Sequence, residues 1–221
     1  MTSRPPPPRG VNMKQRKMII KGRRVSELAA ARRLSPLLKT CMDYLHLKQL
    51  YRQGWLRAGI TRARCESVAE HTLGVTLLAL FFGEALYRKL DRAKLLRMAL
   101  LHDFGEIYAG DIIPHNGVYP VNKHALETAS VKKVFGRLAK GREYEALWNE
   151  FEESRTPEAR LLRELDRFEM ALQAFAYEQE GLAALPRFFE SADKAVRSPA
   201  LRKLLKEMRA AATQGKAARK R

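Results

Sequence analysis

Residues 66–90 read ESVAEHTLGVTLLALFFGEALYRKL, and this stretch predicts one long helix from Val68 to about Leu90. Ser67 and Glu70 form a capping-box pattern, in which the hydroxyl and the carboxylate each satisfy one backbone amide of the first turn. The whole chain is rich in residues that favour helices: Leu and Ala together number 59, whereas Val and Ile together number 15. This composition favours helices and argues against a β-sandwich or barrel. A length of 221 residues allows one domain, or one domain with tails.

The rest of the chain shows helical spacing between clear breaks. Gly54 and Gly59 interrupt the pattern, so residues 52–65 are expected to form an ordered loop. Residues 105–121, with three Gly and two Pro, are expected to form a second loop rich in titratable groups. No segment shows a strand pattern, and the sequence predicts a single all-α domain with a helical-bundle architecture. The other expected helices are 26–31, 36–51, 92–103, 122–138, 143–152, 157–180 and 199–212.

The formal net charge is +18, and it lies at the two ends of the chain. Residues 1–64 hold 16 Lys/Arg and 2 Asp/Glu (net +14), residues 65–186 hold 15 and 19 (net −4), and residues 187–221 hold 11 and 3 (net +8). Basic ends indicate sequence-independent attraction to polyanions, RNA included, or targeting, rather than a basic groove through a folded domain. We therefore divide the chain into a basic Pro-containing extension (1–35), a mildly acidic domain (36–186), and a basic C-terminal helix and tail (187–221).

The first 24 residues contain the run Pro5 to Pro8, eight basic residues and no acid, and we expect them to be largely disordered. Four interpretations stay open: a solvated basic tail, an organelle-targeting segment, a nucleic-acid-binding arm, or translation from Met13 or Met18. Two cysteines, Cys41 and Cys65, cannot form a disulfide framework, which favours a reducing compartment such as the cytoplasm. No apolar run reaches the roughly 18 residues of a membrane span, so none is expected.

Four side chains do not suit the apolar surroundings that the pattern predicts for them. His71 lies in the first turns of the long helix, His102 and Asp103 follow the apolar run 98–101, and Asp166 lies beside the apolar stripe of the helix 157–180. A lone buried carboxylate is costly unless it meets a cation. Two imidazoles and two carboxylates converging from three helices would bind one divalent transition metal, either Mn, Fe, Co, Ni or Zn. Taken singly, each has an ordinary alternative: a packed or surface histidine, a polar helix end, or an aspartate paired with a nearby arginine.

Four short motifs occur along the chain in a fixed order. They are ESVAEH (66–71), LHDFGE (101–106), AGDIIP (109–114) and LDRFEM (165–170). Together they resemble the HD-domain metal-dependent phosphohydrolases, and in particular the branch that contains the 5′-deoxynucleotidases. RQGW (52–55) and KHALE (123–127) are similar to further elements of that branch. The likeness covers roughly residues 36–180 and implies an HD-domain helical bundle between the basic ends.

The resemblance also implies a role for each matching residue. It implies one metal held by four ligands, two carboxylates that act on the attacking water and the leaving group, and two residues at the substrate end of the pocket. These are, respectively, His71, His102, Asp103 and Asp166; Glu106 and Asp111; and Arg52 and Trp55. A homodimer is compatible with the resemblance. The stretch 56–64 is more basic than the family pattern, and the loop 115–121 departs from it, which leaves substrate choice open.

Elementary chemistry agrees with these roles. A phosphate monoester repels attacking water, and a metal neutralises a phosphoryl oxygen and lowers the pKa of bound water. Glu106 or Asp111 can move the proton, Arg52 can grip phosphate with its planar fork, and Trp55 can stack on a base or sugar. The ordinary alternatives are solvated loop carboxylates, a surface arginine and a packing tryptophan. Further phosphate-side candidates are Lys123 and His115.

We therefore expect a metal-dependent phosphohydrolase that removes the 5′-phosphate from (deoxy)nucleoside monophosphates. One alternative is an HD-fold module that binds RNA or a ribonucleoprotein through its basic ends. Another is an HD phosphohydrolase for a different phosphoester, such as a cyclic nucleotide or an alarmone.

Overall fold

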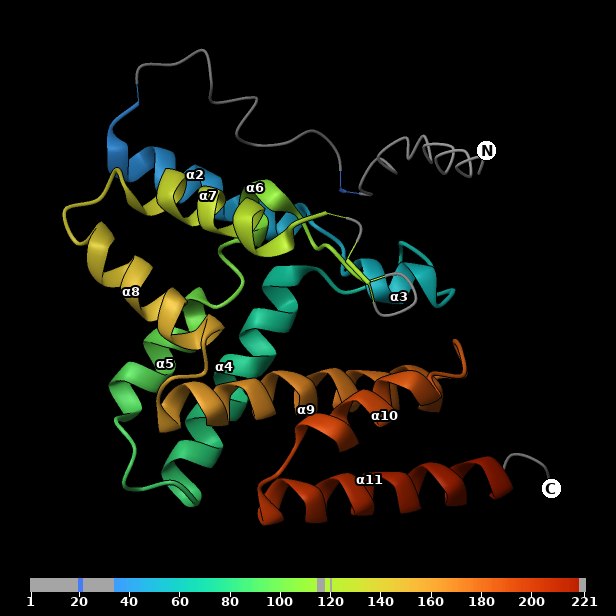
Figure 1. Ribbon diagram of the computed structural model, residues 1–221. Coiled ribbons are helices and arrows are strands. Elements are labelled where there is room, and N and C mark those ends of the chain that lie inside the picture. The colour runs from blue at the N-terminus through green and yellow to red at the C-terminus, as the bar shows by residue number, and fades with distance from the viewer. Residues whose placement is uncertain (1–19, 22–33, 115–117, 120, 219–221) are drawn as a thin grey trace, which may run out of the picture.

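The computed structural model describes residues 20–21, 34–114, 118–119 and 121–218, with side chains described up to residue 212. The helix expected at 26–31, His115 and nearly all of the N-terminal segment expected to be disordered lie outside these residues. The described chain is all-α, as predicted, and it contains no β-sheet. Isolated antiparallel β-bridges join Ile20 to Leu50 and Tyr51 to Ser67. The helices, labelled as in Figure 1, are α2 (Pro36–Gln49), α3 (Gln53–Arg57), α4 (Val68–Ala85), α5 (Arg92–Leu101), α6 (Glu106–Ala109), α7 (Lys123–Phe135), α8 (Gly141–Glu152), α9 (Pro157–Gln179), α10 (Pro186–Ala195) and α11 (Pro199–Ala218).

Side-chain caps set where several of these helices begin. The Thr156 hydroxyl accepts a hydrogen bond from the backbone of Ala159 at 3.3 Å, and Pro157 occupies the first position of α9. Both halves of the predicted capping box of α4 are present, between Ser67 and Glu70. Most helix ends lie close to their predicted positions. The exceptions are α4, which stops at Ala85, five residues before its predicted end, and α11, which continues to Ala218, six residues past its predicted end.

Three helices were not expected from the sequence. Helix α3 lies in the segment 52–65, helix α6 lies in the segment 105–121, and helix α10 lies where no helix was expected. Helices α3 and α6 have five and four residues, too few for an apolar period to be visible. Helix α10 carries a proline at its start and buries Phe189 and Ala192, which is a signal that the sequence interpretation missed.

Helix α9 runs across the middle of the molecule, next to α4, α5, α10 and α11, while α2, α6 and α7 group at the opposite side from α11 (Figure 1). The larger hydrophobic cluster includes side chains of α4, α5, α9, α10 and α11. The smaller one is formed mainly by α2, α6, α7 and α8, together with Val68 at the start of α4. Leu201 and Leu205 of α11 are buried in the larger cluster. The C-terminal segment 187–221, which differs from the preceding segment in its net charge, thus contributes side chains to the same hydrophobic core.

Helix α4 combines an apolar sequence with partial burial. Within the described part of the chain it is the one helix long and apolar enough to span a membrane by length and composition, with 18 residues and a mean hydropathy of 1.2. A core helix passes the same test, and α4 packs against α5 and α9 and carries His71. Its other face leaves Leu73, Leu77 and Phe81 exposed.

Candidate metal centre

His71 enters the site from the first turn of α4, where the capping box fixes the backbone. Ser67 donates its backbone N–H to the Glu70 carboxylate at 2.6 Å, and Glu70 donates its own to the Ser67 hydroxyl at 3.3 Å. The next residue, His71, is 1% exposed and points into the interior.

His102 and Asp103 follow the last turn of α5. The His102 Nδ1–H donates to the Ala99 carbonyl at 2.7 Å, so the lone pair of the neutral ring lies on Nε2. The Trp148 indole N–H donates to the His102 carbonyl at 3.1 Å and ties this turn to α8. Ring and backbone of His102 are therefore both held by hydrogen bonds.

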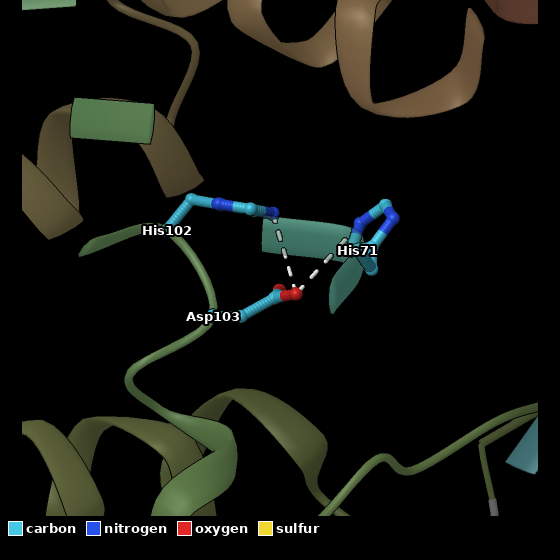
Figure 2. Close-up of side chains that lie close together, drawn as sticks. All are labelled: His71, His102 and Asp103. Carbon is cyan, nitrogen blue, oxygen red and sulfur yellow. Dashed lines mark ion pairs between the residues drawn. The ribbon is translucent and has the colours of Figure 1, made fainter. Parts of the chain in front are cut away.

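Asp166, from the middle of α9, completes the convergence. Its Oδ1 lies 3.2 Å from His71 Nε2, while Asp103 Oδ2 lies 3.8 Å from His71 Nε2 and 3.3 Å from His102 Nε2. Figure 2 shows the two imidazole rings approaching the Asp103 carboxylate from α4 and from the turn after α5. The structure thus brings the four predicted ligands together from three helical segments.

The donor atoms of this cluster fit a metal ion. One ligand atom each from His71, His102 and Asp103 lies within 4.8 Å of the others. Six buried side-chain N or O atoms in the described residues lack a hydrogen-bond partner, and four of them belong to this site: His71 Nε2, His102 Nε2, Asp103 Oδ2 and Glu106 Oε2. Buried polar atoms are rarely left without a partner, and mixed N and O donors suit a first-row divalent cation.

The buried carboxylates of the cluster also favour the binding of a positive charge. Burial and Arg52 lower the pKa of His71, but Asp166 and Glu169 outweigh them and raise it to about 10. Burial raises the pKa of Asp103, yet the charges of His102 and His71 bring it well below its usual range. Protons on the imidazoles and a metal cation are therefore alternative ways to balance the carboxylates.

Glu169 holds His71 from the side away from the cluster. Its Oε2 accepts a hydrogen bond from His71 Nδ1 at 2.5 Å, which leaves Nε2 as the metal-facing nitrogen. A Cβ at Gly74, one turn further along α4, would lie 2.6 Å from Glu169 Oε1. A glycine at position 74 is therefore what allows the carboxylate to reach the ring. Sequence reasoning missed Glu169, although it belongs to the motif at 165–170.

Arg52, Asp111 and Glu106 lie beside the cluster. Arg52 Nη1 lies 3.6 Å from Asp111 Oδ1, and the Gln53 backbone N–H donates to Asp111 Oδ2 at 2.5 Å. Burial lowers the pKa of Arg52, but Asp111, Asp103 and further carboxylates raise it well above its usual value. Both oxygens of Asp111 are engaged, whereas Glu106 is 2% exposed and its Oε2 has no partner among the described residues. Of the two predicted acid–base carboxylates, Glu106 is thus the one with an oxygen available.

Trp55 lies in the hydrophobic core rather than on an open rim. It is 2% exposed, its ring stacks on Phe188 with centroids 4.0 Å apart, and its indole N–H donates to Glu66 at 2.6 Å. The geometry corresponds to the packing alternative, because no face of the ring is open for a base or sugar. Sequence spacing could not distinguish the two, since a tryptophan suits a core and a pocket equally.

Lys123 lies at the start of α7 near the same carboxylates. Its Nζ is 3.3 Å from Glu127 Oε1. Burial is the largest single effect on the pKa of Lys123 and lowers it, but Glu106, Glu127 and Asp103 together outweigh burial and raise this pKa. A Cβ at Gly105 would lie 2.7 Å from the Cβ of Glu127, so this glycine allows α7 to approach the turn that carries Asp103.

The fold and the site define an all-helical protein with a buried cluster of two histidines and two aspartates that fits a metal. The HD domain family matches residues 45–209 of this sequence. The chain therefore belongs to the HD domain family.

Two curated relatives are similar over most of the chain. The 5′-deoxynucleotidase HDDC2 of Dictyostelium discoideum is 34% identical over 66% of this chain and 82% of its own length. The 5′-deoxynucleotidase hdd1 of Schizosaccharomyces pombe is 31% identical over 61% of this chain and 68% of its own.

Solved structures show the same fold. The PH0347 protein from Pyrococcus horikoshii has a TM-score of 0.66 and 32% identity over 77% of this chain and 97% of its own. A structure from Magnetospirillum magnetotacticum, titled a predicted metal-dependent phosphohydrolase, has a TM-score of 0.63 and 25% identity over 81% and 92%. The resemblance seen in the motifs is confirmed, and it implies a divalent metal for this chain.

Proposed function

We propose that this protein is a metal-dependent phosphohydrolase that removes the 5′-phosphate from deoxynucleoside monophosphates. The observation that carries the proposal is the group of buried atoms without a hydrogen-bond partner on His71, His102 and Asp103, next to Asp166 and to the buried pair of Arg52 and Asp111. The two curated relatives, each named a 5′-deoxynucleotidase, support the substrate class.

We assign the four converging side chains as ligands of one divalent ion, either Mn, Co, Fe, Ni or Zn. The ion would neutralise charge on the phosphoryl oxygens and lower the pKa of water bound to it. The ring of His71 is oriented by Glu169 and that of His102 by the Ala99 carbonyl, so both present Nε2 to the same point.

The remaining roles fall to the neighbouring residues. Arg52 binds the phosphate, and Asp111 positions it by pairing with the guanidinium and with the α3 backbone. Glu106 orients the attacking water or moves a proton, because its free Oε2 is buried beside Asp103. Hydrolysis breaks the bond between phosphorus and the 5′ oxygen, which leaves as the protonated hydroxyl of the nucleoside. Trp55, a buried residue of α3, anchors this helix through its stacking on Phe188 and its hydrogen bond to Glu66.

The domain boundaries, the oligomeric state and the cellular location are also proposed from the sequence. Residues 36–186 would carry the catalytic residues, between a basic extension and a basic C-terminal segment. A homodimer would be recognised by light scattering, and a cytoplasmic or organellar location by a fluorescent fusion with and without residues 1–24. The other phosphoesters belong in the same substrate panel.

The test is phosphate release from a panel of deoxy- and ribonucleoside 5′-monophosphates, a cyclic nucleotide and an alarmone, with Mn or Co added. We expect metal-dependent release from the deoxynucleotides that falls to background in Asp103→Ala. Asp193→Ala, which removes a half-buried aspartate of α10 paired with Arg209, is the matched control and keeps the activity. If no member releases phosphate in a way that depends on both metal and Asp103, the proposal fails.

A further inference from the structure

A basic surface lies at the junction of α10 and α11. A hollow of about 330 Å³ is lined by five residues, of which four are cations and none is an acid. We call Arg197, Arg202, Lys203 and Lys206 the α11 basic surface; all four are exposed. Within the described part of the chain, none of the four forms an ion pair, whereas Arg209 on the same helix pairs with Asp193.

The α11 basic surface is built on a fixed frame. Glu164 of α9 accepts hydrogen bonds from the backbone N–H groups of Arg197 and Ser198, at 3.1 and 2.8 Å. The apolar side of α11 is anchored in the core by Leu201 and Leu205, which are 0% and 2% exposed. The four cations therefore stay close together. None of their side chains forms an ion pair among the described residues, and the carboxylate of Glu164 is engaged with backbone N–H groups.

We infer that the α11 basic surface binds the phosphate backbone of a nucleic acid without reading its sequence. Phosphates supply the negative charge that this group of cations lacks, and such contacts need no base-specific geometry. The sequence after the described side chains adds Lys216, Arg219, Lys220 and Arg221 and no acid. Helix α11 lies at the edge of the molecule opposite α2 and α7 (Figure 1), so a long polyanion can contact it from outside.

A nucleic acid fits this surface better than a membrane does. A helix that lies in a bilayer surface exposes large apolar side chains next to its cations. On α11 the apolar side chains Leu201, Leu205 and Met208 are buried in the protein, and none of the exposed large hydrophobic residues in the described chain lies on this helix. The inference is independent of the proposed enzyme activity, because none of the four cations belongs to the metal centre.

The test compares two variants of the full chain that carry the same net charge. The surface variant replaces Arg197, Arg202, Lys203 and Lys206 with Gln, which lowers the net charge from +18 to +14. The control variant replaces four exposed cations with Gln: Lys39 of α2, Lys132 of α7, Lys140 just before α8, and Arg142 of α8. The N-terminal cations contribute equally to both, so a difference between the variants reports the surface itself.

Fluorescence anisotropy with a labelled single-stranded RNA of mixed sequence, measured over a range of salt concentrations, gives the result. We expect the surface variant to bind at least about tenfold more weakly than the control variant, with a salt slope lower by about 3, from about 0.7 for each of four lost contacts. Equal binding by the two variants, or no binding by the native chain at low salt, overturns the inference. It is also overturned if the surface variant loses binding to phosphatidylserine vesicles while its RNA binding is unchanged. Far-ultraviolet circular dichroism serves as the folding check, because it does not depend on the proposed activity, and the spectrum is expected to be unchanged in both variants.

Discussion

Replacing Gly74 with Ala tests the geometry of the metal centre without touching any proposed ligand. The new Cβ would lie 2.6 Å from Oε1, 3.0 Å from Cγ and 3.1 Å from Cδ of Glu169. Real Cβ atoms do not approach so closely, so the carboxylate has to withdraw. It then loses its 2.5 Å contact with His71 Nδ1, and the ring is no longer held with Nε2 toward the cluster.

The expected effect on metal affinity is larger than the effect on folding. Ala in place of Gly within a helix favours the folded state by about 1 kcal/mol, and the lost charged hydrogen bond costs about 1.5 to 3 kcal/mol. The free energy of unfolding should therefore fall by no more than about 2 kcal/mol. Loss of a residue that orients a ligand costs about 10- to 100-fold in metal affinity, which is about 1.4 to 2.7 kcal/mol.

The assay is a competition titration of Co²⁺ or Mn²⁺ against a chelator, with urea unfolding of the metal-free protein beside it. Gly83→Ala is the matched control on the same helix, because its Cβ would meet only Leu95 at 3.3 Å and Arg92 at 3.9 Å. A double-mutant cycle with Glu169→Ala identifies the cause: once the carboxylate is gone, Gly74→Ala should no longer weaken binding. Native metal affinity in Gly74→Ala, or an equal loss in the Glu169→Ala background, would refute the reasoning.

Three further predictions concern the surroundings of the site and the fold. In steady-state kinetics, Arg52→Lys should raise KM for a nucleotide about tenfold with a smaller change in kcat, because an ammonium group cannot reproduce the planar fork of a guanidinium. The control Arg57→Lys should change neither KM nor kcat. Burial raises the pKa of Glu127 to about 7 from an ordinary 4.5, against the effect of Lys123. Between these two pKa values the folded state keeps a proton that the unfolded chain releases, so the free energy of unfolding falls as pH rises from about 4.5 to about 7. Urea titrations over this range should show a smaller fall for Glu127→Gln than for the native protein. An equal fall would contradict Glu127 as the origin. Asp43 is 4% exposed and accepts from the Tyr108 hydroxyl at 2.7 Å, so Asp43→Ala should lower the free energy of unfolding by about 2 kcal/mol in urea, and an unchanged midpoint would argue against it.

Much of the secondary structure follows from local sequence. The capping residues and the spacing of apolar side chains act over three or four residues, so α2, α4, α5, α7, α8, α9 and α11 could be recognised from the chain alone. The misfit of His71, Asp103 and Asp166 in apolar surroundings also indicated a metal site, because a buried charge needs a partner wherever the fold places it.

Other features depend on how the helices cross. Trp55 lies in the core because α10 brings Phe188 against it, and Asp111 is engaged because the start of α3 meets it. Glu169 contacts a histidine 98 residues earlier in the chain, through space that Gly74 leaves open. The residue types and their local order thus determine the helices and the kind of chemistry. Which atoms meet, and which stay without a partner, is decided by packing between distant segments, since spacing along one helix contains no information about its angle to another.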